Sequence, residues 1–389
     1  MHKEFDVIIV GGGAVGLALA RALSGSGLEL ALVEPHAPRS DSPLPADWDN
    51  RVYALSPGSA AFLERCGAWQ LLAEERVTRV EAMRVYGDRA DTCLRFDAYD
   101  AALRELAFIV EGNRLQRALW SSVREQDIEF FAIDWKTLEL AADRAVLSLA
   151  DGTEICARLL VGADGANSRV REAAAIAVTS SDYRQLGVVA NFSCATPHRG
   201  TAYQWFMREG VLALLPLPGD RVSMVWSTAV EHGQRLLALA PQDLAAEVES
   251  ASRGALGALR LLATPAAFPL RLQRVERFVK SRLALAGDAA HNVHPLAGQG
   301  MNLGLRDARI LSDTLIGRGP WRDCGEHALL RRYERSRKED VVAMQLTTDG
   351  LQKLFMSDAV LVSDARNLGL RLVDRLPYLK SLLVNQAVA

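Results

Sequence analysis

The sequence of 389 residues has few cysteines and no dense group of metal-binding side chains. Its cysteines are odd in number and widely spaced, which predicts no disulfide framework and no zinc site, and is typical of a reducing compartment. They are Cys66, Cys93, Cys156, Cys194 and Cys324. Among the seven histidines only His291 and His294 lie close together, in a glycine-rich stretch described below. We therefore expect no metal site.

Long apolar runs and an excess of one charge are also missing. No uninterrupted apolar run approaches the ~18 residues that a membrane-spanning helix needs. The formal net charge is −2, so the charge balance does not favour a nucleic acid partner. The stretch before the first expected strand is too short for a signal or transit peptide, and we expect a cytoplasmic protein. A chain of this length can bury a large core in two or three domains.

The N-terminus has the order of a dinucleotide-binding unit. An apolar, β-branched run, Phe5–Val10, predicts a parallel strand buried on both faces. Gly11, Gly13 and Gly16 follow in Gly-x-Gly-x-x-Gly spacing, and Ala14–Leu23 has helical composition. The glycines permit a tight turn, close approach to a pyrophosphate and close packing of helix on strand. The pyrophosphate would lie at the helix N-terminus, beside Ala14 and Val15.

An acidic residue completes this unit. A second expected strand, Leu28–Val33, ends at Glu34, about the usual distance after the glycines for a carboxylate that binds a ribose 2′-hydroxyl. Such an acid disfavours a 2′-phosphate, and so disfavours NADP in this site. The alternative is a charge that simply ends a strand.

A second glycine-rich block, GDAAHNVHPLAGQGMNLGLRDA, covers residues 287–308. Asp288 follows an apolar strand and is placed to accept hydrogen bonds from a sugar-like chain. Gly298 and Gly300 let the backbone come close to a ligand. A helix is expected to begin near Gly300, so the free N–H groups of Gly300, Met301 and Asn302 could face an electron-rich ring.

A third block, LVGADGANSRVR, covers residues 160–171. Asp164 and Gly165 predict a turn after a strand, and Ser168 could cap a helix that begins around Arg169. Alone, this block could be an ordinary junction between a strand and a helix.

Together the three blocks resemble the FAD-dependent aromatic hydroxylases of the p-hydroxybenzoate hydroxylase fold. Within them the sequence is most similar to the ubiquinone-biosynthesis hydroxylases, with further likeness at IVEGNRLQRALW (109–120) and LRRYERSRK (330–338). The resemblance implies bound FAD, NAD(P)H as electron donor, and Asp164 and Gly165 beside the pyrophosphate. It also implies that Arg51 faces the phosphate or ribityl side of the flavin. The family usually has Asn or Gln where this chain has Gly112, and Asn113, one position on, could take its place.

The resemblance implies a mixed α/β fold: a Rossmann-like FAD-binding domain, an inserted antiparallel-sheet substrate domain and C-terminal helices. The FAD-binding domain would be discontinuous, with residues 1–76, 105–180 and 275–345. Residues 77–104 and 181–274 would form the substrate sheet, in which we expect Gln234–Leu262 to be helical. Residues 346–389 would form a C-terminal helical segment.

The implied reaction is ring hydroxylation of a polyprenylated phenol in ubiquinone biosynthesis, through a flavin C4a-hydroperoxide and O2. His294 and Pro295 would lie near the reacting oxygen. The substrate pocket would be walled by Leu212, Leu214 and Trp226. Position C5 of the ring is favoured, with C1 and C6 left open. Two other functions are also left open: a related monooxygenase or reductase of another aromatic or isoprenoid substrate, and a non-catalytic flavoprotein scaffold.

The C-terminal part of the sequence has two features that concern contacts with a membrane or with other proteins. Residues 326–355 predict one long helix or two, with a basic cluster of Arg331, Arg332, Arg335, Arg337 and Lys338. The cluster is either a solvated face or a contact with anionic lipid or an acidic partner. A leucine-rich segment, Leu368–Val384, could pack in the core or dock peripherally on the inner face of the cytoplasmic membrane. Contacts with other ubiquinone-biosynthesis proteins and a homo-oligomer are left open.

Overall fold

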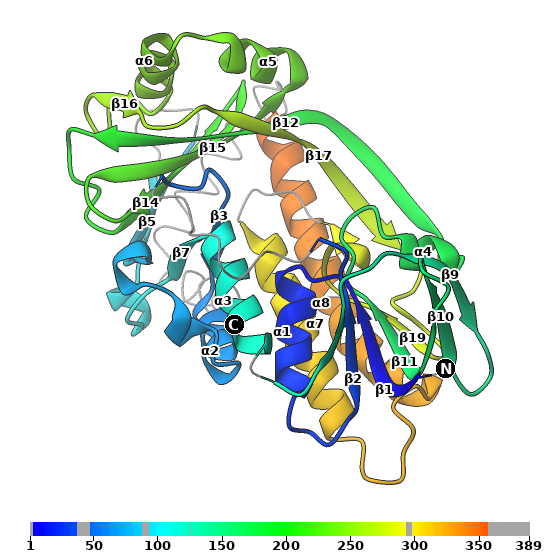
Figure 1. Cartoon of the computed structure of the whole chain (residues 1–389). Coiled ribbons are helices and arrows are strands. Elements are labelled where there is room, and N and C mark those ends of the chain that lie inside the picture. Colours follow the sequence, from blue (N-terminus) through cyan, green and yellow to red (C-terminus); the bar gives the residue numbers. More distant parts are fainter. Residues whose placement is uncertain (1–2, 37–46, 88–92, 125, 293–297, 357–389) are drawn as a thin grey trace.

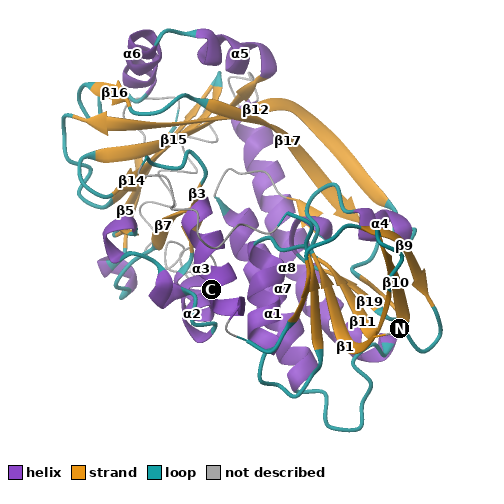
Figure 2. Ribbon diagram, in the orientation of Figure 1, coloured by secondary structure: helices purple, strands orange, loops and turns teal. Residues whose placement is uncertain are grey.

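The computed structural model describes residues 3–36, 47–87, 93–124, 126–292 and 298–356. These residues form two large sheets, a small sheet and a set of helices, so the mixed α/β class expected from the sequence is confirmed (Figures 1 and 2). The leucine-rich segment Leu368–Val384 lies outside the described residues, as do His294 and Pro295.

The first sheet is the Rossmann-like one. Its order is β18-β19-β11-β1-β2-β8, and β10 and β9 extend it from β11. β19, β11, β1, β2 and β8 are parallel to their neighbours in this series. The apolar run at the end of β1 is almost completely buried, as expected for a central parallel strand. The strands are β1 (Lys3–Val10), β2 (Leu30–Val33), β8 (Glu129–Phe131), β9 (Trp135–Leu140), β10 (Ala145–Leu149), β11 (Glu154–Gly162), β18 (Val279–Lys280) and β19 (Leu283–Leu285).

The second sheet has the order β20-β17-β12-β15-β14-β13-β5-β6, with β16 beside β12. Its pairs are antiparallel apart from β13 and β5, which pair in parallel. In Figure 1, the long strands β12 and β17 run from this sheet towards α4. The strands are β5 (Ala82–Tyr86), β6 (Cys93–Asp97), β12 (Val178–Cys194), β13 (Thr201–Met207), β14 (Gly210–Leu217), β15 (Arg221–Ala229), β16 (Leu259–Leu261), β17 (Ala266–Val275) and β20 (His291–Asn292).

A third, small antiparallel sheet has the strand order β3-β7-β4. Its strands are β3 (Val52–Leu55), β7 (Ala107–Glu111) and β4 (Thr78–Val80). Part of its apolar surface packs with residues of β13 and β14, such as Ala202 and Leu217. The small sheet therefore packs against the antiparallel sheet.

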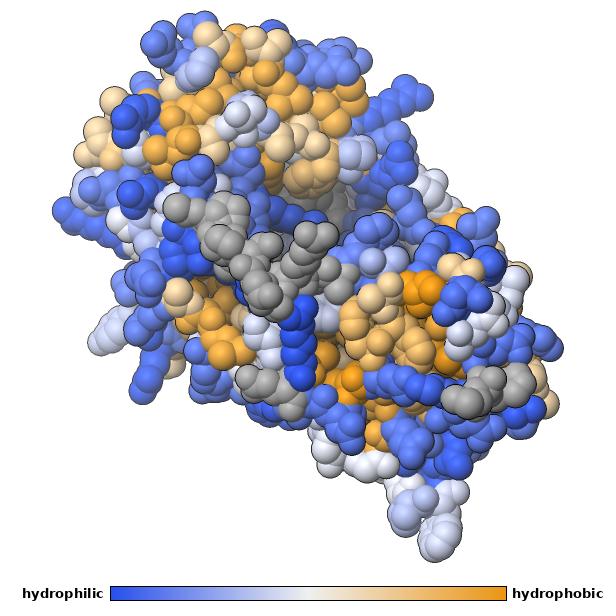
Figure 3. All heavy atoms as spheres, in the orientation of Figure 1, coloured by the Kyte–Doolittle hydropathy of each residue, from blue (hydrophilic) through white to orange (hydrophobic). Residues whose placement is uncertain are grey.

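The helices form two groups, one beside each of the two large sheets (Figure 2). α1, α3, α7 and α8 pack beside one another, and α5 and α6 cover the antiparallel sheet. The expected helix 234–262 is instead two helices followed by β16. Figure 3 shows apolar side chains grouped at the α5–α6 end of the molecule. Across the described residues, no helix is both long and apolar enough to cross a membrane. The helices are α1 (Ala14–Leu23), α2 (Pro57–Arg65), α3 (Gly112–Arg124), α4 (Arg169–Ala173), α5 (Val230–Ala238), α6 (Pro241–Ala251), α7 (Gln299–Ile316) and α8 (His327–Met356).

Candidate active site

A cavity of about 1500 Å³ lies between the carboxyl ends of the parallel strands and the antiparallel sheet. Ligands of open parallel sheets bind at this edge. The structure brings most of the residues predicted to bind a cofactor to the cavity wall. They are Gly11, Gly13, Ala14, Val15, Glu34, Arg51, Asp164, Gly165, Asp288, Gly298, Gly300, Met301 and Asn302.

The glycines of the first motif are needed for three different reasons. Gly11 has a φ of +114°, and a Cβ there would lie 2.4 Å from the carbonyl oxygen of Ala163. A Cβ on Gly16 would lie 2.0 Å from the carbonyl oxygen of Gly11, so Gly16 lets α1 pack on the turn. A Cβ on Gly13 would meet no protein atom within 4 Å, because Gly13 faces the cavity. Gly11 and Gly16 therefore serve the fold, and Gly13 leaves room for a ligand.

Two helices begin at the cavity wall. α1 follows Gly13, and α7 follows Gly298, which has a left-handed φ of +61°. Neither helix has an acidic residue in its first turn or a capping side chain. The first N–H groups of a helix lack partners within the helix and carry a positive partial charge. The cavity therefore offers two places for anionic or electron-rich groups.

Close packing of α1 on α7 brings these two helix starts together. A Cβ on Gly304 of α7 would lie 2.6 Å from the Val15 side chain of α1. A Cβ on Gly287 would lie 3.1 Å from the same side chain. Gly287 and Gly304 thus fit around Val15, and Gly287 also lines the cavity.

Side chains also hold the peptide groups of Gly12. Its N–H donates to Oε2 of Glu34 at 2.7 Å, and its carbonyl oxygen accepts from Nε2 of Gln116 at 3.1 Å. The other oxygen of Glu34 accepts from the N–H of His36 at 2.8 Å. Glu34 is therefore more than a charge that ends a strand, since it fixes the glycine turn. Its role towards a ribose stays a prediction.

Arg51 lies on a segment that a buried glutamate holds. Glu111, 1% exposed, accepts from the N–H of Asp49 at 2.8 Å. It also accepts from Nε of Arg76 and of Arg114, at 2.8 and 2.9 Å. Asp49 in turn accepts from the N–H of Arg51 at 2.9 Å. These contacts fix the backbone from which Arg51 reaches the cavity wall.

Gly112 is packed closely against Arg51 and Tyr53. A Cβ would lie 3.1 Å from the carbonyl oxygen of Arg51 and 3.3 Å from the ring of Tyr53. Its neighbour Asn113 lines the cavity, and the Oδ1 of Asn113 is buried without a protein partner. Because buried polar atoms are normally hydrogen-bonded, Asn113 fits a donor group of a bound ligand.

The turn at Asp164 is stabilised locally. Its carboxylate accepts from Oγ of Ser168 at 2.5 Å and from the N–H of Val170 at 3.1 Å. Ser168 caps α4 by accepting from the N–H of Arg171 at 3.0 Å, which confirms the predicted cap. Asp164 lines the cavity, but both of its oxygens already accept within the protein.

Arg171 is a site residue that the sequence did not reveal. Its guanidinium donates to the carbonyl oxygens of Ala166 and Ala289, both at 3.0 Å. It therefore ties the Asp164 turn to the turn that carries Asp288. Its neighbour Arg169 has the same residue type, so residue type alone gave no signal of the burial of Arg171.

Asp288 is exposed on the cavity wall, between the buried residues Gly287 and Ala289. Burial raises the pKa of its carboxyl above the usual range, and the charges of His291 and Arg51 offset only part of this. Burial likewise raises the pKa of the nearby Tyr53, which also lines the cavity. The carboxylate of Asp288 can accept hydrogen bonds from the hydroxyl groups of a sugar-like chain in the cavity.

The predicted substrate residues Leu212, Leu214 and Trp226 do not reach the cavity. They are at most 2% exposed and pack in the core beneath α5 and α6, with residues such as Leu236 and Leu244. The cavity is lined by the alternate residues of the same strands, because successive side chains of a strand point to opposite faces. These residues are Val211, Ala213, Leu215, Val225 and Ser227.

The basic cluster on α8 is only partly a surface feature. Arg337 is 1% exposed, and its Nε pairs with Oδ1 of Asp307 at 2.6 Å. Arg331 pairs with Glu334, and Nζ of Lys338 donates to a backbone carbonyl oxygen. The prediction of a surface cluster is therefore wrong for Arg337, which belongs to the interior.

Comparisons with known proteins agree with this geometry. A family model described as FAD binding domain matches residues 4–348. The chain is 36% identical to ubiquinone hydroxylase UbiL of Rhodospirillum rubrum, over 99% of this chain and 90% of the relative. It is 32% identical to the 3-demethoxyubiquinol 3-hydroxylase of Escherichia coli, over 97% of each chain. The chain belongs to the FAD-dependent monooxygenases of the ubiquinone-hydroxylase family.

A solved structure has the same fold as this monooxygenase. PqsL of Pseudomonas aeruginosa matches 95% of this chain and 100% of its own length, with a TM-score of 0.78 and 24% identity. The likeness covers both the parallel and the antiparallel sheet, since nearly the whole chain is matched.

The cavity of the monooxygenase fits its cofactors, FAD with NAD(P)H as electron donor. Gly13 leaves space at the start of α1 for a diphosphate. The uncapped start of α7 and the unpartnered Oδ1 of Asn113 provide further donors and acceptors. Among the described residues no group of His, Cys, Asp or Glu side chains forms a metal site.

Proposed function

We propose that this monooxygenase hydroxylates the aromatic ring of a polyprenylated phenol, a precursor of ubiquinone. The observation that carries the proposal is the apolar wall that the antiparallel sheet gives to the cavity. Val211, Ala213 and Leu215 of β14 and Val225 of β15 line this side. Apolar surroundings with few polar groups suit a lipid-like substrate with a polar ring.

The centre of the wall has small side chains flanked by polar ones. Gln204 pairs with Ala213, which pairs with Val225, so the three lie in one row across the sheet. Ser227 is two residues along β15 from Val225 and on the same face. We expect the ring to lie over Ala213 and Val225, with Gln204 and Ser227 as partners for its oxygen atoms.

FAD, when bound and reduced by NAD(P)H, supplies the activation of O2, from which one oxygen atom enters the ring and the other leaves as water. The chain positions the cofactor and substrate. The start of α1 and Gly13 would hold the diphosphate, and Asp288 would accept from the ribityl hydroxyls. The N–H groups of Gly300 and Met301 would stabilise negative charge on the flavin ring. The apolar wall would exclude water from the reacting atoms.

The names of two relatives support the substrate class, since one is a ubiquinone hydroxylase and the other a 3-demethoxyubiquinol 3-hydroxylase. We favour position C5 of the ring, and this choice rests only on the sequence resemblance of residues 109–120 and 330–338. A polyprenyl tail is too insoluble to diffuse freely. We therefore propose that the enzyme collects its substrate at the inner face of the cytoplasmic membrane or from a partner protein.

Deleting the gene and identifying the accumulated quinone precursor tests this proposal. We expect a polyprenylated phenol that lacks the C5 hydroxyl, and restoration of quinone by the wild-type gene but not by the Gly13→Val variant. Accumulation of a precursor that lacks a different hydroxyl would change the assigned ring position but would leave the substrate class unchanged. Unchanged quinone synthesis in the deletion strain would contradict the substrate class itself.

A further inference from the structure

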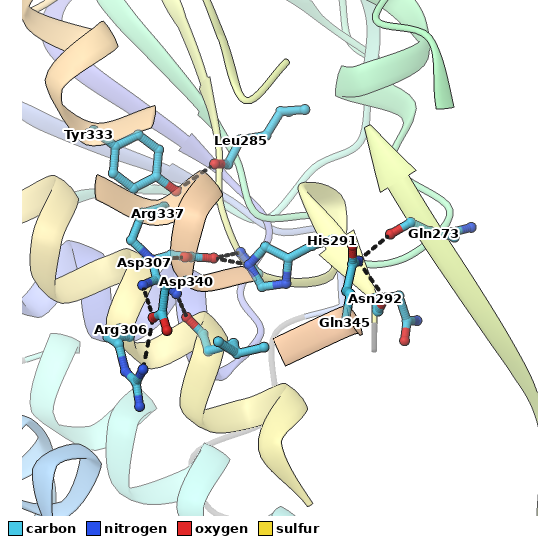
Figure 4. A network of polar contacts seen from close by, with 12 residues as sticks. Gln273, Leu285, His291, Asn292, Arg306, Asp307, Tyr333, Arg337, Asp340 and Gln345 are labelled. Atoms are coloured by element: carbon cyan, nitrogen blue, oxygen red, sulfur yellow. Dashed lines mark hydrogen bonds and ion pairs between the residues drawn. The ribbon is translucent and has the colours of Figure 1, made fainter. Parts of the chain in front are cut away.

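The turn that carries Asp288 is held at both ends by one buried carboxylate. Asp307 of α7 is fully buried, and its Oδ2 accepts from the N–H of Gly287 at 2.9 Å. The same oxygen is 2.6 Å from Nε2 of His291 (Figure 4). Asp288 lies between these two anchored residues and lines the cavity. The position of Asp307 thus constrains how Asp288 meets the cofactor.

Asp307 is itself held by α8. Its Oδ1 accepts from Nε of Arg337 at 2.6 Å, and Arg337 also pairs with Asp340. Asp340 accepts in addition from Arg306 at 2.8 Å, which completes the network. Burial alone would raise the pKa of Asp307, but His291 and Arg337 outweigh it and hold the pKa below the usual range. Asp307 therefore stays ionised and can accept from several donors.

α8 also contacts the far end of the turn. Nε2 of Gln345 donates to the carbonyl oxygens of Asn292 and Gln273, at 3.2 and 3.1 Å. Asn292 lines the cavity and pairs with Gln273 of β17 in the antiparallel sheet. Arg337 and Gln345 lie about two helical turns apart, or ~12 Å along the helix. One helix thus holds the cofactor-facing turn at Asp307 and joins it to the substrate sheet at Asn292.

We propose that Asp307 is a positioning residue for Asp288, and that α8 sets the shape of the cofactor-facing turn through Arg337 and Gln345. Stability alone does not account for the arrangement, since a buried ion pair is often no more stabilising than an apolar pair of similar volume. An apolar pair could not accept from Gly287 and His291. The network therefore gives Gly287 and His291 a hydrogen-bond acceptor, which apolar packing could not provide.

The test compares FAD affinity with the melting temperature of the FAD-free protein. Asp307→Leu or Arg337→Met alone removes one half of the buried Asp307–Arg337 pair and leaves the other buried charge with fewer partners, which should lower the melting temperature. The double variant Asp307→Leu/Arg337→Met should regain most of the lost melting temperature. Its dissociation constant for FAD should nevertheless stay roughly tenfold or more above that of the wild type. Adding Asp288→Ala to the double variant should weaken FAD binding little further, because Asp307 acts through Asp288.

A second variant covers the case in which the double variant does not fold. His291→Phe removes one bond to Asp307 and keeps a ring against Phe278, which lies 5.8 Å from His291 between ring centroids. It should fold and bind FAD several-fold more weakly. The control is Arg322→Met, which breaks the ion pair with Glu326 outside this network and should leave FAD affinity unchanged. Wild-type FAD affinity in every folded variant of Asp307 or His291, or full additivity with Asp288→Ala, would overturn the proposal.

Discussion

Arg171 donates a hydrogen bond to the carbonyl oxygen of Ala289, 118 residues further along the chain, at 3.0 Å. Its second bond, to the carbonyl oxygen of Ala166, lies beside the Asp164–Gly165 turn. One buried guanidinium thus fixes the spacing of two segments that both face the cofactor. We therefore expect the geometry of the FAD site to depend on this side chain, although Arg171 is not in the cavity wall.

Replacing Arg171 by methionine should weaken FAD binding. The buried carbonyl oxygen of Ala289 and the partly buried one of Ala166 lose a charged donor, at a typical cost of ~1.5–3 kcal/mol for each hydrogen bond to a charged group. Titration of the FAD-free protein with FAD, followed by flavin fluorescence, measures the change. Arg144→Met is the matched control, because Arg144 pairs with Glu4 on the surface. Equal FAD affinity in the two variants would show that Arg171 has no part in shaping the site.

Two glycine variants should separate binding from folding. Gly13→Val should fold with a melting temperature near that of the FAD-free wild type, because its side chain points into the cavity, but should be isolated without flavin. Gly16→Ala should be destabilised, because its Cβ would lie 2.0 Å from the carbonyl oxygen of Gly11. Flavin absorbance and thermal melting of both proteins make the comparison. Full flavin content in Gly13→Val would contradict the placement of the diphosphate.

Asp288→Asn should have opposite effects on binding and on stability. FAD affinity should fall, because the ribityl hydroxyls lose a charged acceptor. The FAD-free protein should become more stable at neutral pH, because burial raises the pKa of Asp288 in the folded state. An acid with a raised folded pKa loses stability as pH rises from the unfolded value of about 3.9 through the folded value.

The gain in stability should therefore be present at pH 7 and disappear as pH falls below about 4, where the carboxyl is protonated in both states. Thermal melting of the FAD-free wild type and Asp288→Asn across this range measures it. A variant that is less stable than the wild type at pH 7 would show that Asp288 is satisfied within the protein.

The two faces of β14 should respond differently to substitution. Ala213→Phe adds a ring on the cavity side, and should block substrate turnover while leaving FAD content and NAD(P)H-dependent flavin reduction near wild type. Leu214→Ala opens a hole beneath α5 and α6, and should lower stability by ~2–5 kcal/mol. Its substrate KM should change little. A large KM effect of Leu214→Ala with none from Ala213→Phe would mean that the substrate lies elsewhere.

The cofactor end of the fold was predictable because it depends on local backbone requirements. The glycine turn and the two helix starts each need particular residues at fixed spacing, and helix α1 has the predicted bounds, Ala14–Leu23. The cap of α4 by Ser168 is likewise a local interaction. Such features are determined by a few neighbouring residues.

The substrate face was not predictable in this way. β14 has apolar residues at almost every position because one face packs on α5 and α6 and the other faces the cavity. The sequence of β14 therefore has no alternation of apolar and polar residues that would show which of Leu214 and Leu215 faces the cavity. Arg171 and Arg337 were missed for a related reason. Their burial depends on acceptors far along the chain, Ala289 and Asp307, which no local pattern reveals.

The central claim, that this flavoprotein inserts an oxygen atom from O2 into a polyprenylphenol, is tested most directly with oxygen-18. The FAD-loaded enzyme would be given NAD(P)H, labelled O2 and the phenol in detergent. We predict one O2 consumed for each hydroxylated product, with one labelled atom in the new ring hydroxyl. Product that takes its oxygen from water, product formed without O2 uptake, or bound flavin that NAD(P)H cannot reduce would contradict the account.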